Sequence, residues 1–244
     1  MNPVKKNLAN AVTCCNVLCG TLSIFVLLGP DVVLGLPSWQ VACLLIFLAA
    51  VADFADGLVA RAVGVSGPLG RELDSLSDLV SFCVAPAVLL RVALLGAGTQ
   101  EWVAWLPALI PVAGAVRLAK FNIDTRQTTS FLGMPVPANA IFWIGYAAAV
   151  YGGWGALASP WLVTIGVVTL CLLMISELPL LALKFKNYSW KGNEARYLLV
   201  MGVCALILLF PGAPGLMLII AWYVVISIIA RLKSGRGATK NGKR

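Results

Sequence analysis

The sequence contains no histidine, and only 11% of its 244 residues are charged. Without histidine, the chain cannot form the Ser/His or Cys/His pair that activates many nucleophiles, and no histidine is present to complete a zinc site. The seven cysteines lie inside apolar runs, without the spacing typical of metal ligands. These absences leave the few carboxylates as the main candidates for catalytic groups.

Charge is scarce because the chain is mostly apolar. Hydrophobic residues make up 60% of the sequence, and the mean hydropathy is +0.93, whereas about a quarter of the residues in a soluble domain are charged. We therefore expect one membrane domain over residues 1–232, followed by a basic, disordered tail over residues 233–244. No A-x-A cleavage site follows the basic N-terminus, so no signal peptide is predicted.

Apolar segments recur along the whole chain. Most are close to the roughly 20 residues that cross a bilayer as a helix, and no internal repeat is visible. The sequence predicts an all-α, polytopic integral membrane protein with about eight transmembrane helices, at residues 12–29, 38–60, 75–96, 101–119, 136–153, 160–183, 196–211 and 214–231.

The basic residues alternate between successive loops. The N-terminus, the connection 61–74, the loops 117–134 and 184–196 and the C-terminal end from Arg231 onward hold 17 of the 18 Lys and Arg residues, all except Arg91. Because cytoplasmic loops are enriched in Lys and Arg, both termini are predicted to be cytoplasmic, in the cell (inner) membrane. Topology thus explains the net charge of +8, and we expect no nucleic-acid partner.

Four aspartates form two closely spaced pairs. Asp53 and Asp56 lie three residues apart, and Asp74 and Asp78 lie four apart, so on helices each pair shares one face. A charged group at membrane depth costs about 2.5–3.5 kcal/mol, so such a cluster needs a compensating cation. We infer a bound divalent metal, and expect it to be Mg²⁺ or Mn²⁺. Two ions about 3.5–4 Å apart can clamp a phosphoryl group, with three acids as ligands and the fourth as general base.

The spacing of these residues carries a family resemblance. The stretch from Asp53 to Asp78 resembles the signature D-x2-D-G-x2-A-R-x8-G-x3-D-x3-D of the CDP-alcohol phosphatidyltransferases at every fixed position. The resemblance implies transfer of a phosphatidyl group from a CDP-linked lipid to an alcohol, with release of CMP. It also implies that Asp53, Asp56 and Asp74 are metal ligands, and that Asp78 is a shared ligand and proton acceptor.

The same resemblance implies a set of residues around the CDP-lipid. They include an asparagine of the first expected span and the small and basic residues between the aspartates: Asn16, Gly57, Ala60, Arg61, Ser66 and Gly70. Outside this motif, small residues in membrane helices are usually packing positions. Arg61 and Asn16 could likewise serve as a topological anchor and as a contact between helices.

Later segments are similar to the phosphatidylserine synthase branch of that family. They are DSLSDLVSFCVAPA, VRLAKFNID, FLGMPVPANA and SELPLLALKFK, with departures at Cys83, where the branch usually has Gly, and at Lys120, where it usually has Arg. The branch implies CDP-diacylglycerol and L-serine as substrates, and the family implies a homodimer. Because serine carries a carboxylate, a cation is expected near the metals. The candidate serine-binding residues are the cationic Arg117 and Lys120, together with the neutral Asn122.

Other interpretations stay open from the sequence. Within the family, glycerol 3-phosphate or inositol phosphate could be the acceptor, although each needs extra cations for its phosphate. An intramembrane prenyltransferase also binds pyrophosphate through acidic motifs, but these normally lie far apart in the chain. A transporter or channel could use the acids as an ion site, but such folds often contain repeated halves.

Overall fold

The computed structural model describes the backbone of residues 3–63, 67–124, 132–181, 189–190 and 193–241, and the side chains within 10–59, 67–124, 132–181, 189–190 and 193–232. The first half comprises α1 (Pro3–Leu28), a hairpin of β1 (Val32–Val33) and β2 (Leu36–Pro37), α2 (Ser38–Val63), α3 (Pro68–Leu79), the π-helical segment η1 (Val80–Val84) and α4 (Ala85–Gly96). The second half comprises the 3₁₀ helix η2 (Val103–Ala108), α5 (Leu109–Ile123), α6 (Val136–Tyr151), the 3₁₀ helix η3 (Gly155–Ala158), α7 (Pro160–Ile175), α8 (Glu194–Leu209) and α9 (Ala213–Asn241).

The all-α membrane architecture is confirmed. Five described segments are long and apolar enough to cross a membrane: Asn10–Leu28, Ser38–Val59, Pro68–Gly96, Val103–Ile123 and Ala213–Leu232. The helices α6 and α7 are apolar but shorter, at 16 residues each. The count of eight spans and the cytoplasmic position of both termini remain predictions. The predicted tail overlaps the end of α9, and its separation from the membrane domain also remains a prediction.

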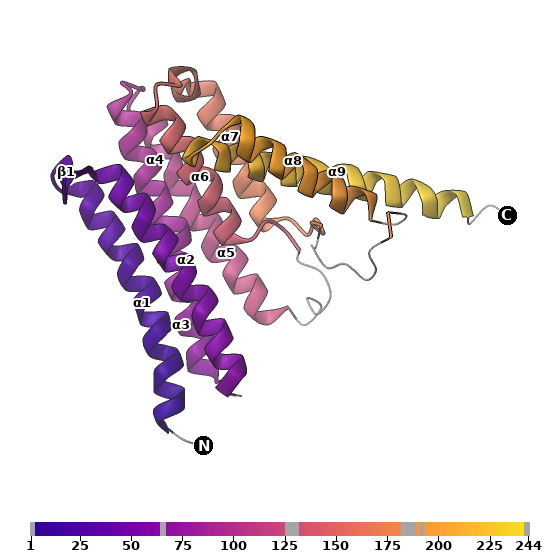
Figure 1. Ribbon diagram of the computed structural model, residues 1–244, viewed down its shortest axis with the longest axis horizontal. Coiled ribbons are helices and arrows are strands. Elements are labelled where there is room, and N and C mark those ends of the chain that lie inside the picture. Colours follow the sequence, from indigo (N-terminus) through magenta and orange to yellow (C-terminus); the bar gives the residue numbers. More distant parts are fainter. Residues whose placement is uncertain (1–2, 64–66, 125–131, 182–188, 191–192, 242–244) are drawn as a thin grey trace.

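The helices form an elongated bundle (Figure 1). The N-terminal helix α1 packs against both α2 and α3, and α6 packs against α4 and α9. The last two helices, α8 and α9, lie side by side and are oblique to α1 and α2, and α9 leads to the C-terminus (Figure 1). The buried core is centred on η1, α4 and α6, where Phe82, Leu90 and Trp143 are almost fully excluded from the surroundings.

Two expected span boundaries were wrong. The expected span 160–183 is helical only as far as Ile175, and Ser176 is already extended. Pro179 explains this end, since proline cannot donate the backbone hydrogen bond that a helix requires; it pairs instead with Leu132 in an isolated β-bridge. The expected span 75–96 begins earlier, at Pro68, because proline is well suited to the first turn of a helix.

The helix that carries Asp74 and Asp78 changes its winding directly after Asp78. Over Val80–Val84 the backbone is π-helical before α4 begins. Pro86 lacks an N–H, so it cannot donate to the carbonyl of Phe82 four residues earlier, and a wider turn accommodates the missing bond. Such π-segments are frequent at functional sites, and this one follows the aspartate pair at once.

Two glycines let neighbouring helices approach this segment closely. A Cβ on Gly20 of α1 would collide with Ser81, and one on Gly114 of α5 would collide with the Sγ of Cys83. Small residues at such crossings allow backbones to pack closely in membranes. The close packing on both sides of η1 brings side chains of α1 and α5 beside Asp78.

Candidate active site

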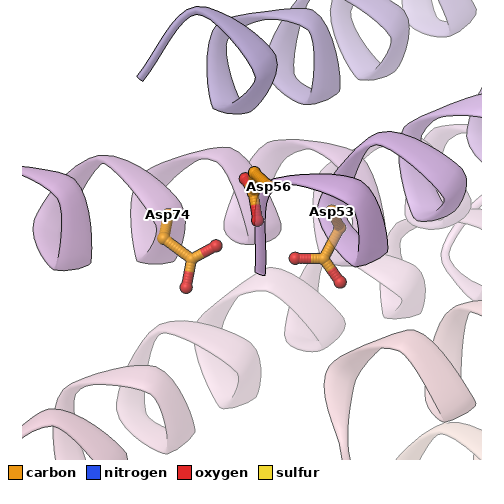
Figure 2. Close-up of side chains that lie close together, drawn as sticks. All are labelled: Asp53, Asp56 and Asp74. Atoms are coloured by element: carbon orange, nitrogen blue, oxygen red, sulfur yellow. The ribbon is translucent and has the colours of Figure 1, made fainter. Parts of the chain in front are cut away.

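Three carboxyl groups converge between α2 and α3. Asp53 and Asp56 come from α2 and Asp74 comes from α3, and one ligand oxygen from each lies within 4.8 Å of the others. Figure 2 shows all three carboxyl groups turned toward a common space. Asp56 is buried, and Asp53 and Asp74 are half-buried. The predicted pairing of the two acidic faces is therefore present in the fold.

Polar side chains of α1 hold two of the aspartates in place. The hydroxyl of Thr13 donates a hydrogen bond to Oδ2 of Asp56 over 2.7 Å. The amide Nδ2 of Asn16 lies 3.4 Å from Oδ1 of Asp78, to which it donates. Asn16 is itself anchored, because Ser81 donates to its backbone carbonyl over 2.9 Å. Thus α1 supplies donors to both pairs of acids.

The cluster suits a divalent cation. Within the part of the chain whose side chains are described, no Lys or Arg forms an ion pair with Asp53, Asp56 or Asp74. Carboxylate oxygens are the ligands preferred by Mg²⁺ and Mn²⁺, and three uncompensated acids at membrane depth would be costly without a cation. The buried Oδ1 atom of Asn16 has no hydrogen-bond partner among the described residues, so one further oxygen is available beside the acids.

A pocket of about 530 Å³ opens beside the acidic cluster. Asp74 and Asp78 line one side, and Arg117 and Asn122 of α5 line another. The Nδ2 of Asn122 donates a hydrogen bond to the hydroxyl of Ser75 over 3.0 Å, and this contact holds Asn122 in place. This volume falls within the usual range of small-molecule sites, about 300–1,000 Å³.

Arg117 is a buried arginine that lines this pocket. Only 9% of its surface is exposed, its Nε has no hydrogen-bond acceptor among the described residues, and its guanidinium carbon lies 5.8 Å from the centre of the Phe121 ring. Buried charges are normally paired because desolvation is costly. An arginine fork aimed into a pocket is therefore ready to bind an anion such as a carboxylate or phosphate.

A second pocket, of about 320 Å³, adjoins the first and lies between α5 and the end of α7. Arg117, Phe121 and Asp124 line both pockets, whereas Lys120 and Glu177 line only this second one. The Nζ of Lys120 donates to the carbonyl of Ile175 over 3.3 Å. The structure thus brings Arg117 and Asn122 to the pocket of the aspartates but leaves Lys120 outside it.

An apolar groove of about 480 Å³ lies on another side of the site. It is lined by residues of α2, η1, α6 and α9, among them Phe47, Phe82, Ile144 and Leu216. Pro137 lines both this groove and the 530 Å³ pocket. An apolar chain in the groove could therefore belong to a molecule whose polar end lies near the aspartates.

The chain was compared with known proteins. A sequence model of the CDP-alcohol phosphatidyltransferases matches residues 6–175, a range that includes all four aspartates and Arg117. The chain belongs to the CDP-alcohol phosphatidyltransferase family.

Three similar members of this family are named CDP-diacylglycerol–serine O-phosphatidyltransferase. The protein of Mycobacterium leprae (strain TN) is 40% identical over 149 residues, 58% of this chain and 49% of that protein. That of Bacillus subtilis (strain 168) is 36% identical over 185 residues, 75% of this chain and 92% of that protein. That of Methanocaldococcus jannaschii is 35% identical over 188 residues, 76% of this chain and 83% of that protein. The chain thus spans about half of the first relative and most of the others.

Of the residues expected to line the CDP-lipid site, three lie on α1, α2 and α3, and the side chains of the other three are not described. Asn16 is fully buried beside Asp78. Gly57 follows Asp56 on α2, and Gly70 lies one turn before Asp74 on α3, near the side chain of Asn10. The side chains of Ala60 and Arg61, and all of Ser66, lie outside the described residues.

Three polar residues of the site were missed by sequence reasoning. Thr13 could have been found, because it lies three residues before Asn16 and so on the same face of α1. Ser75 and Asp124 gave no such signal. Ser75 contacts Asn122, which is 47 positions away in the sequence, and the two pockets that Asp124 lines form only once α5 packs against α3 and α7.

Proposed function

We propose that this family member is a phosphatidylserine synthase, which transfers the phosphatidyl group of CDP-diacylglycerol to the hydroxyl of L-serine and releases CMP. The observation that carries the proposal is Arg117, a buried arginine whose Nε has no hydrogen-bond acceptor among the described residues, in the pocket that Asp78 also lines. The names of the relatives point to the same reaction.

Asp53, Asp56 and Asp74 would hold divalent metal, with Asp78 as a shared ligand, and Mg²⁺ or Mn²⁺ matches their oxygen donors. We propose two ions. Bound there, they would neutralise charge on the pyrophosphate and on the leaving CMP. The hydrogen bond from Thr13 fixes the Asp56 carboxylate, as outer partners commonly do for metal ligands.

Asp78 is the proton acceptor in this proposal. The serine hydroxyl oxygen attacks the phosphorus that carries the diacylglycerol, its proton passes to Asp78, and the bond from that phosphorus to the CMP oxygen breaks. Asn16 orients the Asp78 carboxyl through its Nδ2. A general base must lie within hydrogen-bond reach of the proton it takes, and Asp78 lines the pocket where serine would lie.

Arg117 binds the serine carboxylate through its planar fork, and Asn122, fixed by Ser75, lines the same pocket. Lys120 lies in the adjoining pocket, where it would attract the anionic group of serine during entry. On the donor side, Asn16, Gly57, Ala60, Arg61, Ser66 and Gly70 are proposed to surround the CDP-lipid.

We place the protein in the cell (inner) membrane with the active site near the cytoplasmic face. The distribution of Lys and Arg among the loops supports this orientation. CDP-diacylglycerol would then enter from the inner leaflet and serine from the cytoplasm. A homodimer is proposed from the family resemblance, and mass measurement by light scattering in detergent tests it.

The function is tested by CMP release from CDP-diacylglycerol by the purified protein in detergent, with and without Mg²⁺ or Mn²⁺. The acceptors are L-serine, glycerol 3-phosphate, inositol and inositol phosphate. We expect release to depend on both serine and metal, with phosphatidylserine as product. Asp31→Asn, which alters an exposed acid in the loop before β1, is a matched control that should keep activity.

Release with a different acceptor would retain the chemistry and overturn the choice of serine. If none of the four acceptors supports CMP release, with or without metal, the result would contradict the family chemistry in this chain. It would favour a prenyltransferase or transporter.

A further inference from the structure

Two oppositely charged residues share the wall between the two polar pockets. Arg117 and Asp124 line both the 530 Å³ pocket and the 320 Å³ pocket. Arg117 is nine-tenths buried, and its Nε has no partner among the described side chains. Asp124 is half-buried at the end of α5. The wall therefore presents a cationic group and an anionic group to the same space.

The position of this pair suits a small ligand that carries both charges. Arg117 lies within α5 and Asp124 is its C-cap residue, seven positions later, so their backbones are about two helical turns apart. Both residues line the same two pockets. An α-amino acid in this space can therefore meet a cation with its carboxylate and an anion with its ammonium.

A zwitterion and a phosphorylated alcohol would meet this wall differently. The carboxylate of serine faces Arg117, and its ammonium needs an acceptor or an anion, which Asp124 supplies through a charge-assisted hydrogen bond. A phosphate acceptor carries extra negative charge and no cation, so the carboxylate of Asp124 repels it. Selectivity against unwanted partners is often built from such repulsion.

Building on the proposed function, we propose that Asp124 is a specificity-determining residue that binds the ammonium group of the acceptor. Arg117 and Asp124 together then recognise an amino acid by both of its charges. Asp78 lines the same 530 Å³ pocket, so the hydroxyl of an amino acid held in this way lies on the side of the acidic cluster.

The test compares acceptors that lack one charge at a time. The KM for L-serine is measured, together with inhibition constants for 3-hydroxypropionate, which lacks the ammonium, and ethanolamine, which lacks the carboxylate. In Asp124→Asn, we expect the KM for serine and the inhibition constant for ethanolamine to rise by about tenfold or more, as for loss of a charged hydrogen bond. The inhibition constant for 3-hydroxypropionate should not rise.

Two further variants separate recognition from a structural role at the end of α5. Asp124→Glu keeps the negative charge and should retain much of the serine affinity. Glu177→Gln removes an acid that lines the 320 Å³ pocket but not the 530 Å³ pocket. This change should leave the ratio of serine affinity to 3-hydroxypropionate affinity unchanged. An equal loss for all three ligands in Asp124→Asn, or none, overturns the inference. If the wild-type protein does not use serine at all, the proposed function has failed instead.

Discussion

The hydrogen bond from Thr13 to Asp56 gives a direct test of the metal centre. Its length is 2.7 Å, both residues are buried, and it joins α1 to α2. In Thr13→Val the shape of the side chain is nearly kept, but the donor is lost. A hydrogen bond to a charged group contributes about 1.5–3 kcal/mol, and each 1.4 kcal/mol corresponds to about tenfold in an equilibrium constant.

We therefore expect Thr13→Val to weaken the apparent affinity for activating metal by about tenfold to a hundredfold, the range typical for partners of metal ligands. The measurement is CMP release titrated with Mn²⁺ at saturating serine, with Mn²⁺ binding followed independently by electron paramagnetic resonance. Thr13→Ser keeps the hydroxyl and should stay close to wild type.

Thr21→Val is the matched control, because Thr21 lies on the same helix but donates only to the carbonyl of Val17 over 2.8 Å. It should leave the metal titration unchanged. If Thr13→Val and Thr21→Val give the same Mn²⁺ affinity as the wild type, Asp56 is not a metal ligand oriented by Thr13, and the assignment of the centre is wrong.

Other changes have distinct expected results. Asp78→Asn should abolish transfer, while metal-dependent binding of a CDP-lipid analogue largely persists. Asp56→Asn should weaken both transfer and binding. Persistent transfer in Asp78→Asn would refute the role of Asp78 as base. Gly114→Ala places a methyl group against the Sγ of Cys83, so it should destabilise the protein by about 1–3 kcal/mol, seen as a lower thermal unfolding midpoint in detergent. Adding Cys83→Ala should recover part of that loss, and strictly additive effects would contradict the contact.

The acidic cluster could be predicted from the sequence because its spacing is local. Separations of three and four residues fix which side chains share a helical face, and the cost of charge at membrane depth demands that the faces meet around a cation. The structure brings Asp53, Asp56 and Asp74 together as this reasoning requires. Hydropathy likewise identified the apolar helices, since length and composition decide which segments can span a bilayer.

Features that depend on tertiary packing were not predictable. The hairpin of β1 and β2 turns through positive φ angles at Leu34 and Gly35, in the short stretch between the expected spans 12–29 and 38–60. The end of α7 is set by Pro179 and by a bridge to Leu132, whereas hydropathy alone extended the helix. Arg117 lines both pockets whereas Lys120 lines only one, and this difference depends on side-chain direction at the end of α5, which sequence spacing does not give.

The most direct test of the central claim is the transfer of labelled serine into lipid by protein reconstituted in vesicles that contain CDP-diacylglycerol. The label is followed after chelation with EDTA and again after Mn²⁺ is restored. We expect label in phosphatidylserine only when metal is present, with one CMP released per labelled lipid, and none with Asp74→Asn. Undiminished incorporation in EDTA or in Asp74→Asn would show that the aspartate cluster is not the metal centre of the reaction.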